Sequence, residues 1–203
     1  MLDYDRLVQE FENQEVIQAN ELINVKFMQK DGRYTTLVDV NCEPHITPAH
    51  FLCMYENIRD EAQVITPECT YVRVLCMEED RFPTTVECFK FPFVSERYVV
   101  LTVYKVPDYK KPGEHLYVAS SRGNKDKQTP EYLGKDFLAS RVLVEPDIST
   151  YQCIRKADGK IYLRWLTSVP TDGVPMWIYK SVHLMKFPTI FKGIYGILAK
   201  QKP

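Results

Sequence analysis

The most constraining feature of this sequence is the change near residue 173 from short β-rich segments to one long helix-forming segment. Before it, segments rich in Val, Tyr, Phe and Thr alternate with connectors that contain Pro, Gly and Asp, which indicates strands joined by short loops. After it, residues 174–199 are long enough for about seven helical turns. Short connections between successive strands favour an antiparallel sheet. We predict these strands at residues 71–77, 84–90, 98–106, 116–121, 137–144 and 160–167.

The N-terminal third combines helical and strand patterns. Residues 2–20 carry apolar side chains at helical spacing and begin with two Asp residues, which suit a helix N-terminus. Residues 25–28 and 34–40 are short β-rich runs around a Lys-Asp-Gly turn and predict a hairpin. Thr47-Pro48 is a typical helix start, so we predict a helix over 47–56, with a continuation to residue 61 left open. The predicted order is helix, two strands, short helix, further strands and one long C-terminal helix, which is an α+β arrangement.

Length and charge limit the class of protein. The chain has 203 residues, which fits a single domain over 1–203. It carries 26 basic and 27 acidic residues, and this balance argues against nucleic-acid binding. No uncharged apolar run reaches the ~18 residues that a membrane span needs, and the acidic start of the chain is unlike a signal peptide. We therefore expect a cytoplasmic protein with free thiols.

The Cys and His residues carry no chemical signature. None of the six Cys residues forms a CxxC pair, so the usual zinc and thiol-redox spacings are absent. His45 and His50 lie five residues apart, without an acidic or Cys partner at a familiar ligand spacing. The sequence has no phosphate-binding glycine loop and no nucleophile elbow. We expect no metal, no cofactor and no catalytic residue, and we interpret the Cys residues as buried apolar thiols.

The strands and the start of the long segment carry motifs in a recognisable order. Residues 87–93 read ECFKFPF and residues 95–101 read SERYVVL, as one strand ends and the next begins. The following strand reads LYVASS at 116–121, and the last strand leads into the helix with WLTSVPTDGVPMWI at 165–178. Together these motifs resemble the START (steroidogenic acute regulatory protein-related lipid transfer) domain family, and are most similar to phosphatidylcholine transfer protein and its relatives. The resemblance extends over 1–199, because the predicted order of elements also matches.

This resemblance implies a fold and a function. The fold is the helix grip, in which a curved antiparallel sheet wraps around the long C-terminal helix and encloses a cavity. The function is to hold one lipid in that cavity, with a phospholipid favoured and a sterol or another lipid open, and with the C-terminal helix as a gate. The protein would be a non-enzymatic monomer that contacts membrane surfaces transiently. A helix-grip enzyme acting on a small hydrophobic substrate and a non-catalytic protein-interaction module stay as alternatives, because fold does not fix function.

The sequence departs from the family pattern at the ligand-specific positions. The family's Arg-Asp-Tyr reads Arg97-Tyr98 here, without the Asp. Of the aromatic box that holds choline, Tyr98 matches, but the Trp position is Val86. The acid and the Arg of sterol-binding members fall on Thr84 and Thr102. Neither headgroup signature is complete, so the resemblance leaves the lipid class open.

The predicted cavity wall follows from the alternation of side chains along two strands. Aligning Tyr98 with the family places alternate residues of 84–88 and 98–104 inside, and their hydroxyl and apolar groups suit a lipid. An inward-facing Arg141 could bind a phosphate or carboxylate, although such an Arg more often faces solvent. An ordinary core with satisfied hydroxyls is the alternative for the strand residues. The predicted lipid-cavity residues are Thr84, Val86, Cys88, Tyr98, Val100, Thr102, Tyr104, Arg141, Trp177 and Ile178.

The C-terminal segment is also the candidate membrane-docking surface. No acidic residue follows Asp172, and the basic residues of this segment accompany many apolar ones, a pattern that suits an anionic membrane surface. A buried core helix whose lysines extend to solvent is the alternative. Pro188 is expected to kink the helix. The predicted docking residues are Lys180, Lys186, Phe187 and Lys192.

Overall fold

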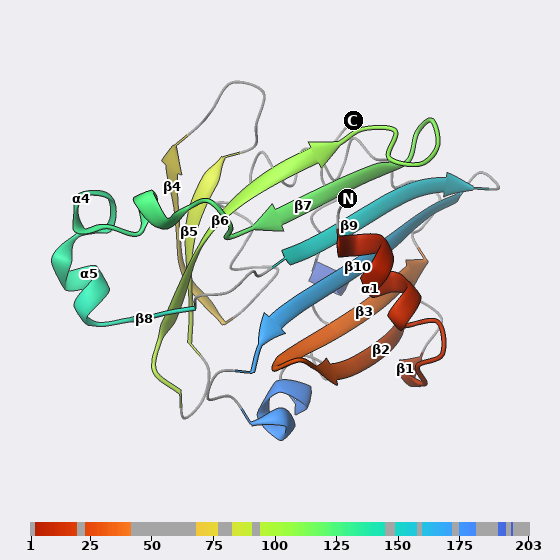
Figure 1. Ribbon diagram of the computed structural model, residues 1–203, viewed down its shortest axis with the longest axis horizontal. Helices are drawn as coiled ribbons and strands as arrows, with labels where there is room; N and C mark the ends of the chain where they lie inside the picture. Colours follow the sequence, from red (N-terminus) through yellow and green to blue (C-terminus); the bar gives the residue numbers. More distant parts are fainter. Residues whose placement is uncertain are drawn as a thin grey trace.

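The structure is a computed structural model of the chain, drawn as a ribbon in Figure 1. It describes residues 3–19, 23–41, 68–76, 83–90, 94–144, 149–157, 160–171, 175–181, 191–193 and 196. The helix predicted over 47–56 lies outside these residues, as does much of the segment predicted as the C-terminal helix, including Pro188.

The described strands form one sheet. Their order is β1-β2-β3-β10-β9-β7-β6-β5-β4, with every neighbouring pair antiparallel, while the short β8 pairs in parallel with β6. Figure 1 shows that β4 and β5 are steeply inclined to the strands at the other end, so the sheet is strongly twisted. The strands are β1 (Val16–Ala19), β2 (Ile23–Lys30), β3 (Arg33–Asn41), β4 (Cys69–Cys76), β5 (Thr84–Phe89), β6 (Arg97–Val106), β7 (His115–Ser120), β8 (Val142–Leu143), β9 (Ser149–Ala157) and β10 (Lys160–Pro170).

Short helices lie around this sheet. They are α1 (Asp3–Glu10), the 3-10 turn η1 (Lys125–Lys127), α4 (Pro130–Leu133) and α5 (Lys135–Ala139). Beyond β10, the described residues 176–181, 191–193 and 196 are helical. In Figure 1, α1 lies in front of the sheet and residues 191–193 lie behind it, so helical segments cover both faces.

One face of the sheet packs against α1, and we call it the outer face. Residues directly opposite each other in neighbouring strands point to the same face, and successive residues of one strand point to opposite faces. A buried cluster joins two residues of the α1 region to residues of β3, β7 and β10. Leu37 of β3 lies directly opposite Leu166 of β10, and Leu116 and Val118 are alternate residues of β7, so these side chains share one face. The members of the cluster are Tyr4, Phe11, Leu37, Leu116, Val118 and Leu166.

The opposite face contacts the helical residues that follow β10, and we call it the inner face. The hydroxyl oxygens of Thr36 and Tyr179 lie 3.3 Å apart. The ring of Phe191 meets the ring of Trp165 edge-on, with 5.6 Å between centroids. Because Thr36 is the strand neighbour of Leu37, these contacts fall on the side of the sheet away from α1.

Several predicted elements are confirmed. The five strands predicted at 71–77, 84–90, 98–106, 116–121 and 160–167 correspond to β4, β5, β6, β7 and β10. The predicted hairpin is β2–β3, and its turn residues Asp31 and Gly32 have positive φ values of 50° and 68°. A two-residue turn in which both residues have positive φ matches the twist of the flanking strands, and Gly at its second position adopts this conformation readily.

The predicted helix over 2–20 is much shorter in the structure. It ends at Glu10, and the chain then turns into β1, which pairs with β2. Lys26 Nζ donates a hydrogen bond of 2.9 Å to the carbonyl oxygen of Phe11, which satisfies a group that the end of a helix leaves free. Phe11 is also fully buried against the outer face, so the chain reverses at this residue.

The strand predicted over 137–144 is wrong, and β9 is missing from the prediction. The first segment is α5 followed by β8, after Gly134 with a φ of 89°. Phe137 and Leu138 both pack on the same cluster, which two successive residues of a strand cannot do. Strand β9 reads STYQCIRKA, and its many polar residues obscure the alternation although it lies between β7 and β10.

Candidate functional site

The seven strand residues predicted to line a lipid cavity do share one face of the sheet. The opposite pairs are Cys88–Tyr98, Val86–Val100, Thr84–Thr102 and Tyr104–Val118. However, Val118 belongs to the cluster that packs against α1. The structure therefore places this predicted wall on the outer face, away from the helical residues after β10.

The apolar part of this predicted wall is a small core beneath α4 and α5. Tyr98 meets Phe137 of α5 edge-on, with 5.3 Å between ring centroids. Burial raises the pKa of the Cys88 thiol to about 11. The cluster consists of Val86, Cys88, Tyr98, Val100 and Leu133. These side chains hold the α4–α5 segment on the sheet.

The polar part of the predicted wall is a closed hydrogen-bond network. The hydroxyl oxygens of Thr84 and Thr102 lie 2.8 Å apart, and Thr102 donates a bond of 3.1 Å to Asn124 Oδ1. Asn124 Nδ2 in turn donates to the carbonyl oxygens of Val100 and Ser120, at 3.2 and 3.3 Å. All five residues are buried. Buried hydroxyl groups with hydrogen-bond partners are typical of an ordinary protein core, which is the alternative to a lipid cavity for these residues. The same bonds attach Asn124, the residue before η1, to the sheet.

Arg141 is also placed on the outer face. Its Nε atom lies 2.7 Å from Glu96 Oε2, and its guanidinium carbon lies 4.4 Å from the centre of the Phe137 ring. Both partners belong to the region around α5 and the start of β6. Arg141 thus holds β8 and α5 against the sheet.

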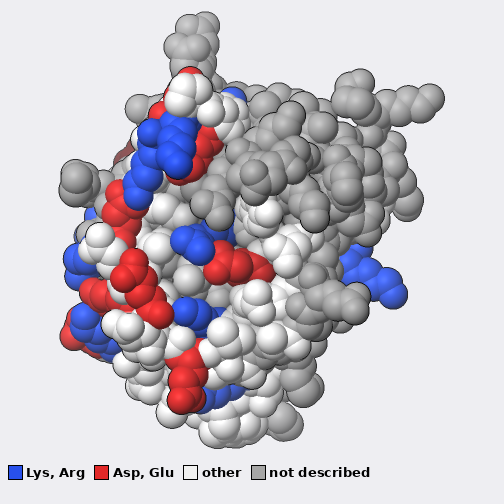
Figure 2. Space-filling model, turned by 90° about the vertical axis from the view of Figure 1, so that its right-hand side faces the viewer, with Lys and Arg blue, Asp and Glu red and all other residues white. Residues whose placement is uncertain are grey.

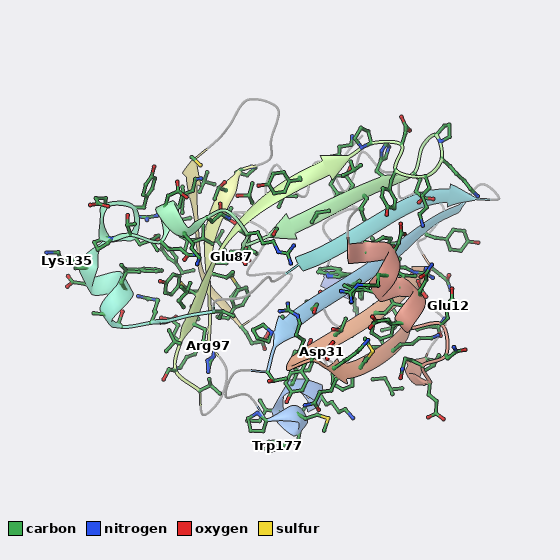
Figure 3. All side chains as sticks on the ribbon, viewed as in Figure 1. Glu12, Asp31, Glu87, Arg97, Lys135 and Trp177 are labelled. Carbon is green, nitrogen blue, oxygen red and sulfur yellow. The ribbon has the colours of Figure 1, made fainter. Side chains whose placement is uncertain are left out.

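Trp177 points to solvent. It is 66% exposed, its neighbour Met176 is 41% exposed, and Figure 3 shows Trp177 at the periphery of the molecule. Ile178 is half-buried. The contact with a lipid cavity predicted for Trp177 does not agree with this position.

The predicted docking lysines are only partly described. Lys180 is half-buried, with its Nζ atom 5.0 Å from the centre of the Phe27 ring, and Lys192 is exposed. Lys186 and Phe187 lie outside the described residues. The structure thus places one predicted docking lysine in an exposed position.

Charge elsewhere on the molecule is mixed. Figure 2 shows acidic and basic side chains interleaved over the described surface on one side of the molecule. Ion pairs from α1 include Asp5 with Lys110 and Glu10 with Lys30. No helix within the described part of the chain is long and apolar enough to cross a membrane. Within the same residues, no group of three His, Cys, Asp or Glu side chains could hold a metal ion.

The inner face of β5, β6 and β7 presents a different set of side chains, which the sequence analysis missed. Starting at Thr36 beside Tyr179, opposite residues lead across β10, β9 and β7 to Val103 of β6. Alternation and pairing then extend this face to β5. We call the resulting set the inner wall; it consists of Thr85, Glu87, Val99, Leu101, Val103 and Tyr117.

A signal for this wall exists in the sequence. The predicted wall depends on matching Tyr98 to the family Tyr, although the Asp that precedes this Tyr in the family is absent. Alignment on Arg97 instead puts Val99 in the place of the family Tyr. A shift of one residue moves every side chain of a strand to the other face, so this choice decides which residues face the helix.

Glu87 places a carboxyl group in the inner wall, between two valines. Its opposite residues on the adjacent strands are Val72 and Val99. Thr85 donates a hydrogen bond of 3.0 Å to Glu87 Oε1. Burial raises the pKa of Glu87, and the Thr85 hydrogen bond offsets part of this increase. Burial also raises the pKa of Tyr117, which is 1% exposed, to about 12, whereas the Glu87 residue is half-buried.

Aromatic contacts hold the helical residues after β10 on the other half of the inner face. Tyr179 is 5% exposed, and its ring centroid lies 4.6 Å from that of Tyr34 and 5.8 Å from that of Phe27. Phe191 is 1% exposed against Trp165. The inner face thus has a part packed by these helical residues and a part formed by the inner wall.

Comparison with known proteins identifies the fold. No family model matches the sequence, and no curated protein matches it. Human StAR-related lipid transfer protein 5 superposes with a TM-score of 0.70 at 8% identity, over 97% of this chain and 93% of that one. Human STARD10 gives 0.68 at 13% identity, over 98% and 79%. The STAR-related lipid transfer protein fragment from Xanthomonas axonopodis gives 0.67 at 13%, over 93% and 100%.

These structures share nearly the whole length of this chain, and the α+β arrangement with an antiparallel sheet agrees with them. The predicted fold is confirmed: the chain is a START-like domain with the helix-grip fold.

Proposed function

We propose that this chain holds one lipid molecule between its inner wall and its C-terminal helix and carries it between membranes, without cofactor or chemical reaction. The observation that carries the proposal is the inner wall, on the helix side of a START-like sheet. Two of the structural neighbours are named lipid transfer proteins, which supports lipid binding in general. A phospholipid is the first candidate ligand, and sterols and other lipids follow.

The composition of the inner wall suits an amphiphile. Val99, Leu101 and Val103 offer an apolar strip on one strand, and the hydroxyl of Tyr117 and the carboxyl of Glu87 offer polar contacts beside it. Each CH₂ group of a lipid chain costs about 0.8 kcal/mol when it is exposed to water. A carrier must therefore enclose the chain almost completely, and an apolar wall with few polar groups meets this need.

An enclosed lipid needs a gate, and the C-terminal helix is the candidate. In the described residues its contacts with the inner face are the Thr36–Tyr179 hydrogen bond and the ring contacts of Tyr179 and Phe191. A hydrogen bond contributes about 0.5–1.5 kcal/mol net, so contacts of this kind can be broken and re-formed during exchange.

The start of this helix is also the candidate membrane-docking surface. Met176 and Trp177 are exposed, and Trp side chains favour the interface between water and lipid. Lys192 is exposed, and each basic residue near an anionic surface adds about 1 kcal/mol. With the predicted contributions of Lys180, Lys186 and Phe187, these residues support the proposal of transient membrane contact, and we propose that the protein is a cytoplasmic monomer.

The experiment that tests the proposal is native mass spectrometry before and after incubation with mixed liposomes, with extraction and identification of bound lipid. A discrete mass increment equal to one lipid supports the carrier function. A protein that stays empty with phospholipids, sphingolipids, sterols and fatty acids would overturn it.

A further inference from the structure

Within the described residues Glu87 has no basic partner, in contrast to acidic residues of β3, of α1 and of the segment before β6. Asp39 pairs with Arg164 at 2.6 Å, Glu96 with Arg141 at 2.7 Å and Glu10 with Lys30 at 3.0 Å. The residues opposite Glu87, in contrast, are valines on both neighbouring strands.

The hydrogen bond from Thr85 engages only one carboxyl oxygen of Glu87. Oε1 accepts this bond of 3.0 Å. Within the described part of the chain, no ion pair engages Glu87 and no basic side chain lowers its pKa. Arg97 is on the same face by register, opposite Phe89, but it is the first residue of β6, and Figure 3 shows its side chain apart from that of Glu87. The second oxygen is therefore available to a ligand.

A carboxyl group in apolar surroundings is costly unless a partner compensates its charge. If the ligand carried a hydroxyl group, a neutral side chain such as Thr would be a sufficient partner. A headgroup whose only charged group is a phosphate would be repelled by the ionised carboxyl. A protonated amine, in contrast, forms a charge-assisted hydrogen bond that is stronger in surroundings of low polarity.

We propose that Glu87 binds the protonated amine of a lipid ligand through its free carboxyl oxygen, so that the protein selects lipids with a primary ammonium group at the polar end. This inference rests on the lipid-binding function proposed above and adds the chemistry of the ligand. The ammonium group could belong to a long-chain amine or to the headgroup of an aminophospholipid.

The test is a competition between matched ligands. Phosphatidylcholine vesicles containing equal small amounts of hexadecylamine and hexadecanol are incubated with the protein, which is then separated from the vesicles, and its bound lipids are extracted and quantified by mass spectrometry. The wild type should be enriched in the amine over the alcohol by about 10- to 100-fold, the range expected for a charge-assisted hydrogen bond. Glu87→Gln should bind both equally. Glu12→Gln, which removes an exposed acidic group, should keep the preference.

A second arm separates the two sources of the amine. Phosphatidylethanolamine competes with its N-acetylated derivative in the same assay, and enrichment of the free amine there indicates an aminophospholipid, whereas enrichment of hexadecylamine alone indicates a long-chain amine. This arm uses the wild type and does not depend on the folding of Glu87→Gln.

The outcomes separate this inference from the function on which it rests. Equal uptake of amine and neutral ligand in both arms, or an amine preference that persists in folded Glu87→Gln, overturns the role of Glu87 but leaves lipid binding intact. A wild type that takes up no lipid from any vesicle overturns both.

Discussion

Thr36 and Tyr179 are joined through their hydroxyl groups, with 3.3 Å between the oxygen atoms, and this contact attaches the helical residues after β10 to the inner face of the sheet. Burial raises the pKa of Tyr179 to about 12, so the hydroxyl stays protonated and able to donate. Leu37, the next residue along β3, packs towards α1 on the outer face. The pair therefore defines which side of the sheet the C-terminal helix covers.

We expect Tyr179→Phe to accelerate lipid transfer. Loss of the hydrogen bond should lower the free energy of unfolding by about 0.5–1.5 kcal/mol and speed transfer by roughly 2- to 10-fold if the helix must leave the sheet for exchange. Transfer of a fluorescent lipid between vesicles measures the rate, and denaturant unfolding measures stability. Tyr132→Phe changes an exposed tyrosine of α4 and serves as control. A less stable Tyr179→Phe protein with an unchanged transfer rate would contradict the gate.

Ala119 and Val118 provide a direct test of the two faces. Ala119 lies opposite Val103 on the inner face and is partly accessible, whereas Val118 packs against α1. We expect Ala119→Phe to lower the fraction of protein that carries lipid, because its ring takes up space beside the inner wall. Val118→Leu should cost about 1–3 kcal/mol of stability through overpacking and leave the lipid content of the folded protein unchanged. Native mass spectrometry and thermal unfolding of both variants check these results, and the reverse pattern would mean that the lipid lies on the outer face.

The Asn124 network is expected to matter for stability alone. Asn124→Ala leaves the carbonyl oxygens of Val100 and Ser120 and the hydroxyl of Thr102 without this partner. Unsatisfied buried groups cost about 1–3 kcal/mol, which denaturant unfolding would detect. The identity of the bound lipid should not change. If Asn124→Ala changed the class of bound lipid without a loss of stability, the residues of this network would contact the lipid after all.

The fold was predictable because its local signals agree with each other. The Asp31-Gly32 turn, the strands around it and the strands of the second half follow period-two patterns with short connectors. The order of these elements indicated an α+β arrangement, and the motifs that resemble the START family indicated the helix grip. Packing information was needed where local signals mislead, as at Phe11, whose burial ends α1 early.

The site was harder to predict because it depends on a single residue of register. The alternation of 84–88 and 98–104 correctly groups side chains by face, but pattern alone does not tell which face meets the helix. Contacts between residues far apart in the sequence, such as Thr36 with Tyr179 and Trp165 with Phe191, decide this. Glu87 is absent from the predicted cavity residues for the same reason: matching Tyr98 to the family Tyr puts Val86 and Cys88 in the cavity wall and Glu87 on the opposite face.

The stability of this protein should decrease as pH rises above the ordinary pKa of Glu87. The pKa of Glu87 is raised above its ordinary value of 4.5 in the folded state. Between these two values the folded state holds more protons than the unfolded state, so the free energy of unfolding falls as pH increases. Each tenfold difference in proton affinity corresponds to about 1.4 kcal/mol. Glu87→Gln should remove this fall and be more stable than the wild type at neutral pH.

The half-buried His115 acts in the opposite direction, and its contribution has to be separated. Burial and the charge of Lys105 lower the pKa of His115 below its ordinary value of 6.5, so its protonation destabilises the folded state as pH falls. The difference between the unfolding free energies of Glu87→Gln and wild type, measured from pH 4 to 8, cancels the contribution of His115. A difference that does not change with pH would show that Glu87 is ionised normally.

Trp177 is expected to attach the protein to membranes. It is 66% exposed beside the exposed Met176, on a segment without acidic residues. Trp177→Ser should weaken binding to vesicles that contain anionic lipid, because the indole would no longer enter the interface, and Lys192→Gln should weaken it further by about 1 kcal/mol. Co-sedimentation with vesicles measures both effects, and raised salt should reduce the contribution of Lys192 selectively. Tyr132→Ser removes an exposed aromatic ring from α4 and should bind vesicles as the wild type does. If Tyr132→Ser loses binding and Trp177→Ser retains it, the docking surface is on the α4 side of the molecule. Membrane contact at the C-terminal helix could then not be what opens the gate.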